Sequence, residues 1–391
     1  MAVASAFSPF RLRGLTLRNR IIKAATFEGM CADGMPSAAL VEHHRQIARG
    51  GAAMTTVAYC SVASDGRSYD TQLWMRPEAV AGLRELTAAV HYERGAASIQ
   101  LGHCGDFADK AVIKGTPIGA SRVYNRYRGS YPRVMTEVDI SRVIGDFARA
   151  AGLAVEAGFD AIELQFGHGY LVSQFLSPYT NRRGDRWGGS LDNRARLAVE
   201  IARVVRSVVG AKVPVLAKIN LLDGFRGGLQ TAEAIEVAVR LQSEGIDAFV
   251  MSGGFVSKSP LFMLRGEVPV VQMAAAQKTI MRKIGVFMFS RLFVQEYPFQ
   301  ELFFLDEARA LRKKVKIPLV LLGGIKTRRN LQIAMSEGFE LVGMARALIH
   351  DPDLVNKFAS QSRDSSDCVP CNECVGAMER GGVECMRRAA R

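Results

Sequence analysis

The feature that most constrains the fold is an alternation of short apolar runs with longer amphipathic stretches along the 391 residues. Short apolar runs are typical of strands that are buried on both faces. Apolar residues that recur every three or four positions predict helices that bury one face. We predict strands at residues 21–25, 54–59, 97–101, 161–165, 213–219, 247–251, 318–322 and 340–344. We predict helices at residues 77–94, 139–157, 192–209, 231–244, 301–314, 327–337 and 351–358.

This alternation predicts an α/β fold with a parallel sheet, and eight strand–helix units close as a (β/α)8 TIM barrel. A doubly wound open sheet is the alternative. No Gly-x-Gly-x-x-Gly motif follows any predicted strand, although open sheets that bind dinucleotides usually carry one. Polar residues follow nearly every strand, and strand ends converge on one face in a barrel. Both observations favour the barrel.

Two segments lie outside a minimal barrel. Residues 254–300 form a long insertion after the sixth strand, rich in Phe, Met and Leu. We interpret it as a helical subdomain over the barrel mouth, serving as a lid, a substrate wall or a subunit interface. The predicted domain organisation is a barrel over residues 1–365, which contains the insertion, and a cysteine-rich tail over residues 366–391.

The charge balance is basic, with 51 Lys and Arg against 38 Asp and Glu, a formal net charge of +13. The basic residues are dispersed, so a solvated basic surface is the simplest interpretation, and an anionic cofactor or substrate also fits. Nucleic-acid binding would need a basic stripe or a known module, and we expect no such partner. No apolar run reaches about 18 residues and no secretory leader is visible. We therefore expect a cytoplasmic protein without a membrane partner.

The ends of the last two strands predict a phosphate site. Gly323 and Gly324 follow the seventh strand, and Ala345 and Arg346 follow the eighth. Backbone N–H groups at a glycine turn before a helix bind anions, and the loops after strands seven and eight of a barrel commonly hold a phosphate. The Arg346 guanidinium would add a charge-assisted contact.

Polar residues near the ends of strands three to five predict an active site. Gln100, Gln165 and Lys218 end these strands, and His168 and Tyr170 follow the fourth. A lysine within an apolar strand needs an anionic partner or a lowered pKa. Each residue alone is more often a satisfied polar group of the core. Together on one rim they form a catalytic constellation.

Three motifs carry a resemblance to a known family. They are Leu-Arg-Asn-Arg-Ile-Ile at residues 17–22, Gln-Leu-Gly-His-Cys-Gly at residues 100–105, and the stretch 167–196 that begins Gly-His-Gly-Tyr-Leu. With them the chain resembles the old yellow enzyme family of FMN-dependent NAD(P)H:flavin oxidoreductases and ene-reductases. The resemblance implies bound FMN, NADH or NADPH as reductant, and hydride transfer through flavin N5 to an activated alkene or related acceptor as a small-molecule substrate.

The resemblance also implies roles for individual residues. Tyr170 matches the proton donor, and a phenol is protonated at neutral pH, as a general acid must be. Gln165 and His168 stand where the family presents two polar donors, usually His with His or Asn. Gln100 would bind the flavin pyrimidine edge, and Lys218 would lie near N1 and O2, where the family usually has arginine. The other implied FMN contacts are Ala25, Thr26 and Tyr59 along the flavin, and Gly323, Gly324, Ala345 and Arg346 at the phosphate.

Four of the seven cysteines lie in the tail, namely Cys368, Cys371, Cys374 and Cys385. Thiolates at this spacing suit a [4Fe–4S] cluster or zinc, and free or disulfide-forming thiols are the third alternative. The tail resembles that of the 2,4-dienoyl-CoA reductase and trimethylamine dehydrogenase branch, which carries a cluster after its barrel. There the second gap is three residues, and here it is two.

Two functions remain as alternatives to an FMN reductase. One is a flavin and iron–sulfur electron-transfer protein, or a thiol redox sensor, that works through the tail. The other is a flavin-free barrel that binds an anionic ligand. The apolar insertion also favours a homo-oligomer.

Overall fold

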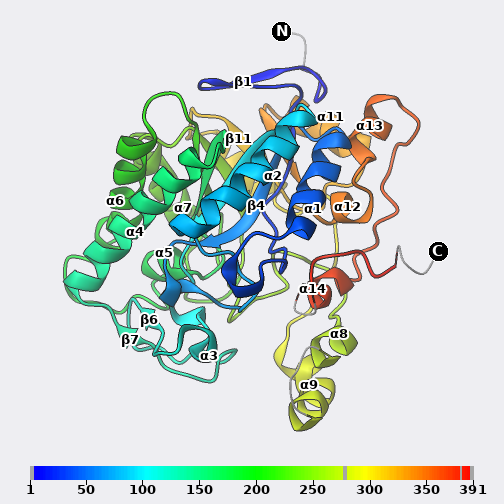
Figure 1. Ribbon diagram of the computed structural model, residues 1–391. Helices are drawn as coiled ribbons and strands as arrows, with labels where there is room; N and C mark the ends of the chain where they lie inside the picture. The colour runs from blue at the N-terminus through cyan, green and yellow to red at the C-terminus, as the bar shows by residue number, and fades with distance from the viewer. Residues whose placement is uncertain (1–3, 276–279, 379–380, 388–391) are drawn as a thin grey trace.

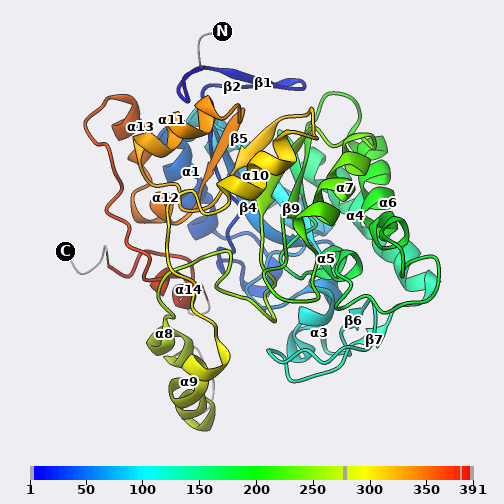
Figure 2. The same ribbon diagram turned by 180° about the vertical axis from the view of Figure 1, so that it is seen from behind.

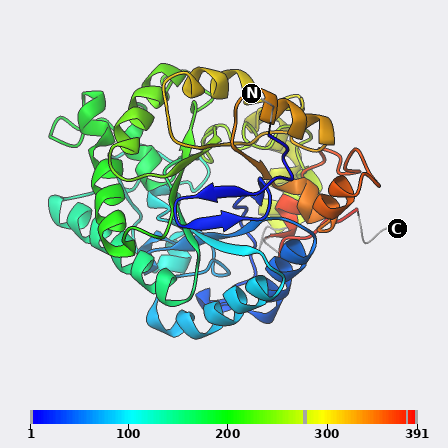
Figure 3. The ribbon, with the colours of Figure 1, turned by 90° about the horizontal axis from the view of Figure 1, so that it is seen from above.

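The computed structural model describes residues 4–275, 280–378 and 381–387. Its centre is a closed parallel barrel in the order β10-β11-β12-β3-β4-β5-β8-β9, ringed by helices (Figures 1 and 3). The predicted TIM barrel is confirmed, and the open sheet is excluded. The strands are β3 (Ile21–Lys23), β4 (Met54–Ser61), β5 (Ala96–Gly102), β8 (Ala161–Gln165), β9 (Val215–Asn220), β10 (Ala248–Ser252), β11 (Leu319–Leu321) and β12 (Leu341–Met344).

The helices around the barrel overlap the predicted ranges but are shorter at several ends. The helix predicted at 301–314 begins only at Leu305, and the segment after the last strand holds two short helices rather than one. The helices are α2 (Val80–Tyr92), α4 (Glu137–Glu156), α6 (Leu191–Val209), α7 (Thr231–Gln242), α10 (Leu305–Arg312), α11 (Arg328–Ser336), α12 (Arg346–His350) and α13 (Leu354–Ala359).

The first helix of the ring, α1 (Ala38–Arg49), was not predicted. It starts after Ser37, whose side chain accepts a hydrogen bond from the Leu40 N–H and so caps the helix. Its buried stripe includes His44, which occupies a position where the pattern calls for an apolar residue. A histidine at that position hides the periodicity on which the prediction depended.

A hairpin of β1 (Phe10–Leu12) and β2 (Leu15–Leu17) lies across the end of the barrel where the strands begin (Figure 3). Leu12 and Leu17 are buried there, in one apolar cluster with Ile22 of β3 and Met54 of β4. The hairpin therefore closes this end of the barrel, and the other end carries the loops that follow the strands.

The insertion after β10 forms α8 (Val270–Ala275) and α9 (Ile280–Phe293), called here the α8–α9 arm. The arm extends beyond the rim at the end opposite the β1–β2 hairpin (Figures 1 and 2). It contacts α14 (Glu373–Ala377) of the tail, where a Cβ on Gly376 would lie 2.2 Å from the Cβ of Gln272. The arm and the tail thus support each other beside the barrel.

Short elements complete the mouth. They are η1 (Ala32–Gly34), η2 (Ser64–Gly66), η3 (Pro77–Ala79), η4 (Gly105–Phe107), α3 (Lys110–Ile113), β6 (Ile118–Gly119), β7 (Arg133–Val134) and α5 (Leu171–Leu176).

None of the helices in the described part of the chain is long and apolar enough to span a bilayer.

Candidate active site

The centre of the site is a buried chain of polar side chains from three adjacent strands. The register places Gln100 opposite Glu163, and Gln165 opposite Lys218. Glu163 Oε1 accepts a hydrogen bond from Gln100 Nε2 at 2.5 Å and pairs with Lys218 Nζ at 3.0 Å. The second oxygen of Glu163 is buried without a hydrogen-bond partner in the described part of the chain. An acceptor without a partner in such a place is available to a ligand.

Glu163 is a site residue that the sequence analysis missed. It is the anionic partner that a buried Lys218 requires, and the two side chains are 1% and 2% exposed. The signal was present, because a carboxylate in the apolar run 161–165 needs a cationic partner for the same reason.

The loop after β3 lies against this chain. The Ala25 carbonyl accepts a hydrogen bond from Lys218 Nζ at 3.3 Å, and the Thr26 hydroxyl is buried without a described partner. The Phe27 ring lies 5.3 Å from that of Tyr59, which lies within the register shift of β4 between Val57 and Cys60. The structure therefore brings Ala25, Thr26 and Tyr59 close to the polar chain, and their contact with a flavin stays a prediction.

A second buried ion pair lies inside the barrel. Lys23 Nζ is 2.6 Å from Glu28 Oε1, and the Ala58 N–H donates to Glu28 Oε2. Burial opposes ionisation of Glu28, but Lys23 and His44 lower its pKa. Glu28, His43 and His44 offer atoms within 4.8 Å of one another, as a metal site would. Because the Lys23 ammonium already neutralises the carboxylate, we interpret the group as an ion-pair cluster.

Gln165 and His168 lie together after β8. Gln165 Nε2 is 3.3 Å from Gln100 Oε1 and 3.4 Å from His168 Nδ1, and His168 Nε2 is 2.7 Å from the Ser252 hydroxyl. Burial, and then the charge of Lys218, lowers the pKa of His168 to about 3. The imidazole is therefore neutral at ordinary pH and offers hydrogen bonds without a charge.

Tyr170 lies in an aromatic cluster beside these groups. Its ring centroid is 4.9 Å from that of Tyr59 and 6.0 Å from that of Phe107. Burial, and then the neighbouring Cys104, raises the pKa of Tyr170, so the phenol keeps its proton. Burial also raises the pKa of Cys104 to about 11, which leaves a protonated thiol and a poor nucleophile.

The ends of β11 and β12 form a cradle of backbone N–H groups. Gly323 and Gly324 have φ values of 101° and 70°, and a Cβ on Gly324 would lie 2.5 Å from the Gln300 carbonyl oxygen. Within the described residues, the N–H groups of Gly323, Gly324 and Ala345 donate to no acceptor. Free backbone donors at a glycine turn fit a phosphate.

The Arg346 side chain lies in a pocket lined by Cys368, Cys371, Cys374 and Cys385, called here the cysteine pocket. Its guanidinium donates to the carbonyl oxygens of Leu264 and Arg265 and to Asn372 Oδ1. Asn372 in turn donates to the carbonyl oxygens of Arg265 and Glu267. Arg346 thus fastens the tail to the base of the α8–α9 arm, while its backbone stays next to the cradle.

The four tail cysteines line this pocket together with Arg346 and His350. His350 Nδ1 is 3.2 Å from Cys385 Sγ, and burial raises the pKa of Cys374 to about 12. In the described residues, no three of the sulfurs lie within 4.8 Å of one another. Tetrahedral zinc holds thiolate sulfurs about 3.8 Å apart, so the four thiols as placed are not arranged around one zinc ion.

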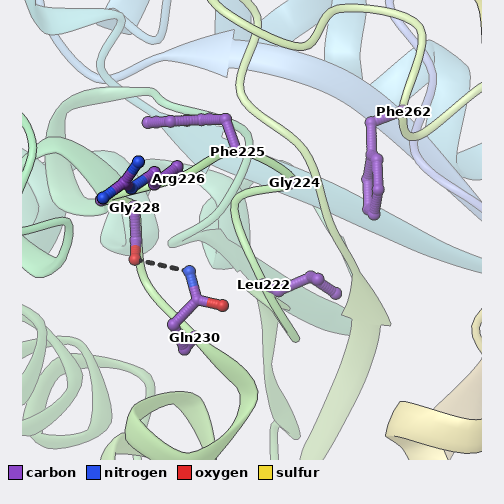
Figure 4. A pocket seen from close by; sticks show the side chains of 8 residues that line it. Leu222, Gly224, Phe225, Arg226, Gly228, Gln230 and Phe262 are labelled. Carbon is purple, nitrogen blue, oxygen red and sulfur yellow. Dashed lines mark hydrogen bonds between the residues drawn. The ribbon is translucent and has the colours of Figure 1, made fainter.

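A shallow hollow lies over the loop after β9 (Figure 4). Phe225 and Arg226 line one side of it, Phe262 from the insertion stands on the other, and the Gln230 side chain donates to the Gly228 carbonyl. The hollow pairs aromatic surface with an exposed guanidinium at the mouth end of the barrel.

The fold and the site together define a barrel enzyme in which buried polar groups and an anion cradle meet at the carboxyl ends of the strands. A model of the NADH:flavin oxidoreductase / NADH oxidase family matches residues 5–257. The chain belongs to this family and is an FMN-dependent NAD(P)H oxidoreductase.

Relatives match most of the chain. It is 42% identical over 387 residues to a 4,4'-dithiodibutanoate disulfide reductase of Rhodococcus erythropolis, covering 99% of this chain and 96% of that one. It is 30% identical to a metal reductase of Desulforamulus reducens over 94% of this chain, but spans only 50% of that protein. The old yellow enzyme homologue from Zymomonas mobilis shares the fold, with a TM-score of 0.75 at 22% identity, covering 94% of this chain and 96% of that one.

Proposed function

We propose that the protein reduces an activated alkene or a related small acceptor, with Tyr170 as the proton donor. The observation that carries the proposal is the buried Tyr170 phenol next to the polar chain of Gln100, Gln165 and His168. A general acid must hold its proton at working pH, and burial ensures this for Tyr170.

Bound FMN would supply the redox chemistry, because it takes a hydride from NAD(P)H and passes it to the acceptor. The residues fit that cofactor. The free N–H groups of Gly323, Gly324 and Ala345 would hold its phosphate. Gln100 and Lys218 would contact the polar edge of its ring, where the partnerless oxygen of Glu163 also lies in the same cluster.

Gln165 and His168 would hold the polar atom of the acceptor. Both are neutral donors, since the pKa of His168 is lowered to about 3. Neutral hydrogen bonds are weaker than charge-assisted ones, so these side chains would polarise a carbonyl modestly. We therefore expect a preference for acceptors that are already electron-poor.

The test is Tyr170→Phe, with Tyr179→Phe as the matched control. We expect turnover of 2-cyclohexenone to fall by about 10²-fold or more, because the general acid is lost. The rate at which NADPH bleaches the flavin should stay unchanged, which separates proton donation from cofactor reduction. Equal alkene turnover in Tyr170→Phe and the parent would remove Tyr170 from this role.

An organic disulfide is the second candidate acceptor. The 42% identity to the Rhodococcus disulfide reductase over nearly the full length of both chains supports it. A hydride would add to one sulfur as the S–S bond breaks, and the departing thiolate would take a proton from Tyr170. Exchange with a thiol of the barrel is not favoured, because burial raises the pKa of Cys31, Cys60 and Cys104. Thiol release from 4,4'-dithiodibutanoate, measured beside enone turnover on one preparation, ranks the two acceptors.

We also propose that the cysteine pocket holds a [4Fe–4S] cluster. The meeting of all four cysteines in one pocket and the neighbouring Arg346 guanidinium, which would balance negative charge, support this. Iron and acid-labile sulfide measured on protein purified without oxygen test it, and about four of each per chain are expected. An iron-free preparation that binds a full complement of FMN would count against it.

A further inference from the structure

We propose that the α8–α9 arm docks the protein on the surface of a bilayer that contains anionic lipids. The starting observation is a set of large apolar side chains on α9 that face solvent. Ile280, Met281, Ile284, Phe287 and Met288 are 70%, 82%, 53%, 63% and 62% exposed. Single exposed apolar residues are ordinary, but a contiguous group of this kind marks an interaction surface.

The five residues form one stripe along the helix. Successive residues of an α-helix are about 100° apart, which places these five within an arc of about 120°. Val271 of α8, 65% exposed, adds a further apolar side chain to the arm. This exposed apolar stripe has no partner within the described residues, and the sequence of α9 is apolar on its other sides as well.

The charge of residues 267–296 indicates which kind of partner would bind the stripe. Between Glu267 and Glu296 the sequence carries four Lys or Arg and no Asp or Glu, within a chain of net charge +13. Lys283 is exposed one turn from Phe287, at the edge of the stripe. An apolar face flanked by basic residues is typical of helices that lie in the interface of an anionic membrane.

A second copy of the chain fits this surface less well. A symmetric dimer through the stripe would bring two identical basic segments together with no acid to offset them. Lipid phosphates would instead neutralise the lysine and arginine charges while the acyl chains receive the apolar side chains.

The position of the arm gives the docking a direction. The arm follows β10 and leaves the barrel at the mouth end, opposite the β1–β2 hairpin (Figures 1 and 2). Docking would therefore turn the mouth toward the bilayer. This revises the expectation from sequence that no membrane partner exists, and it does not depend on which acceptor the enzyme reduces.

The experiment is vesicle flotation of the full chain loaded with FMN, using phosphatidylcholine vesicles with and without 30% phosphatidylglycerol (about one lipid in three). We expect binding to the anionic vesicles at low salt. Ile284→Ser/Phe287→Ser should lower the bound fraction by about tenfold or more, and Lys283→Glu should weaken binding to the anionic vesicles only. Tyr92→Ser, at a 79% exposed aromatic residue at the end of α2, is the control and should bind as the parent does.

Three results would overturn the proposal. The first is a parent protein that floats with neither vesicle. The second is a double variant that floats as well as the parent. The third is a dimer, seen by light scattering without vesicle binding, that the double substitution converts to a monomer, because the stripe would then belong to a second copy.

Discussion

The barrel site and the cysteine pocket both gather reactive groups, but they are assembled differently. In the barrel, Gln100, Glu163 and Lys218 come from adjacent strands whose register fixes their places, and the ion pair is sealed from water. In the pocket, the cysteines come from one short segment that Arg346 and Asn372 fasten to the base of the arm. From this difference we expect substitutions in the barrel site to lower the stability of the whole fold. Substitutions in the pocket should affect only the tail and its surroundings.

The largest effect is expected from breaking the buried ion pair. Lys218→Met leaves the Glu163 carboxylate buried without its partner, which should lower the free energy of unfolding by about 3–5 kcal/mol. Urea unfolding measures this. Lys218→Met/Glu163→Gln should regain most of the loss, and Lys110→Met, at an exposed lysine, should change little. A loss below about 1 kcal/mol in the single variant would mean that the pair does not hold the barrel together.

A pH series tests whether His168 in the barrel site is shielded from water, as its lowered pKa indicates. The folded pKa of His168 is about 3 and its unfolded value is about 6.5, so between these values only the unfolded chain binds the proton. Proton binding by the unfolded chain therefore lowers the free energy of unfolding as the pH falls below about 6.5, and it has little effect well above that pH.

From pH 6.5 to 5, the parent should therefore lose about 2 kcal/mol relative to His168→Asn, in which the titrating group is absent. Urea unfolding at both pH values measures the difference. His91→Asn, at an exposed histidine, is the control. Parallel pH curves for the parent and His168→Asn would contradict the shifted pKa.

A smaller effect should follow from separating the tail from the arm. Gly376→Ala places a Cβ 2.2 Å from that of Gln272, so α14 must move, at a cost of about 1–3 kcal/mol. We expect faster alkylation of the tail cysteines and unchanged FMN content. Gly285→Ala, where no atom lies within 4 Å, should alkylate at the parent rate.

The smallest effect on the barrel should come from Cys374→Ser. If the two regions are independent, FMN content and alkene turnover should stay within about twofold of the parent, while the iron content falls sharply. Joint loss of iron and FMN would show instead that the pocket supports the barrel site.

The sequence predicts the barrel site better than the pocket for a physical reason. Gln100, Gln165 and Lys218 were found because strand ends converge in any barrel, and one periodicity decides which residues end a strand. Glu163 was missed although a carboxylate in an apolar strand needs a cationic partner, because that partner, Lys218, lies on the adjacent strand β9. The partners of Arg346 lie in residues 264–265 and at Asn372, and no local pattern reports a contact between such distant segments.

Helix α1 and the α8–α9 arm show the same limit of prediction from sequence, because both depend on contacts with distant segments. Helix α1 carries a histidine in its buried stripe, and that histidine is explained by its contacts with Thr55 of β4 and with Glu28. The apolar character of the insertion is plain in the sequence, but whether it covers the mouth or extends beyond the rim depends on its packing against the tail.

The β1–β2 hairpin has a consequence for traffic through the enzyme. Since the hairpin closes one end of the barrel, we expect the electron donor and the electron acceptor to reach the site through the same opening, at the carboxyl ends of the strands. The two would then bind one after the other rather than together. An excess of either one would compete with binding of the other, so the rate would be highest when neither is in great excess.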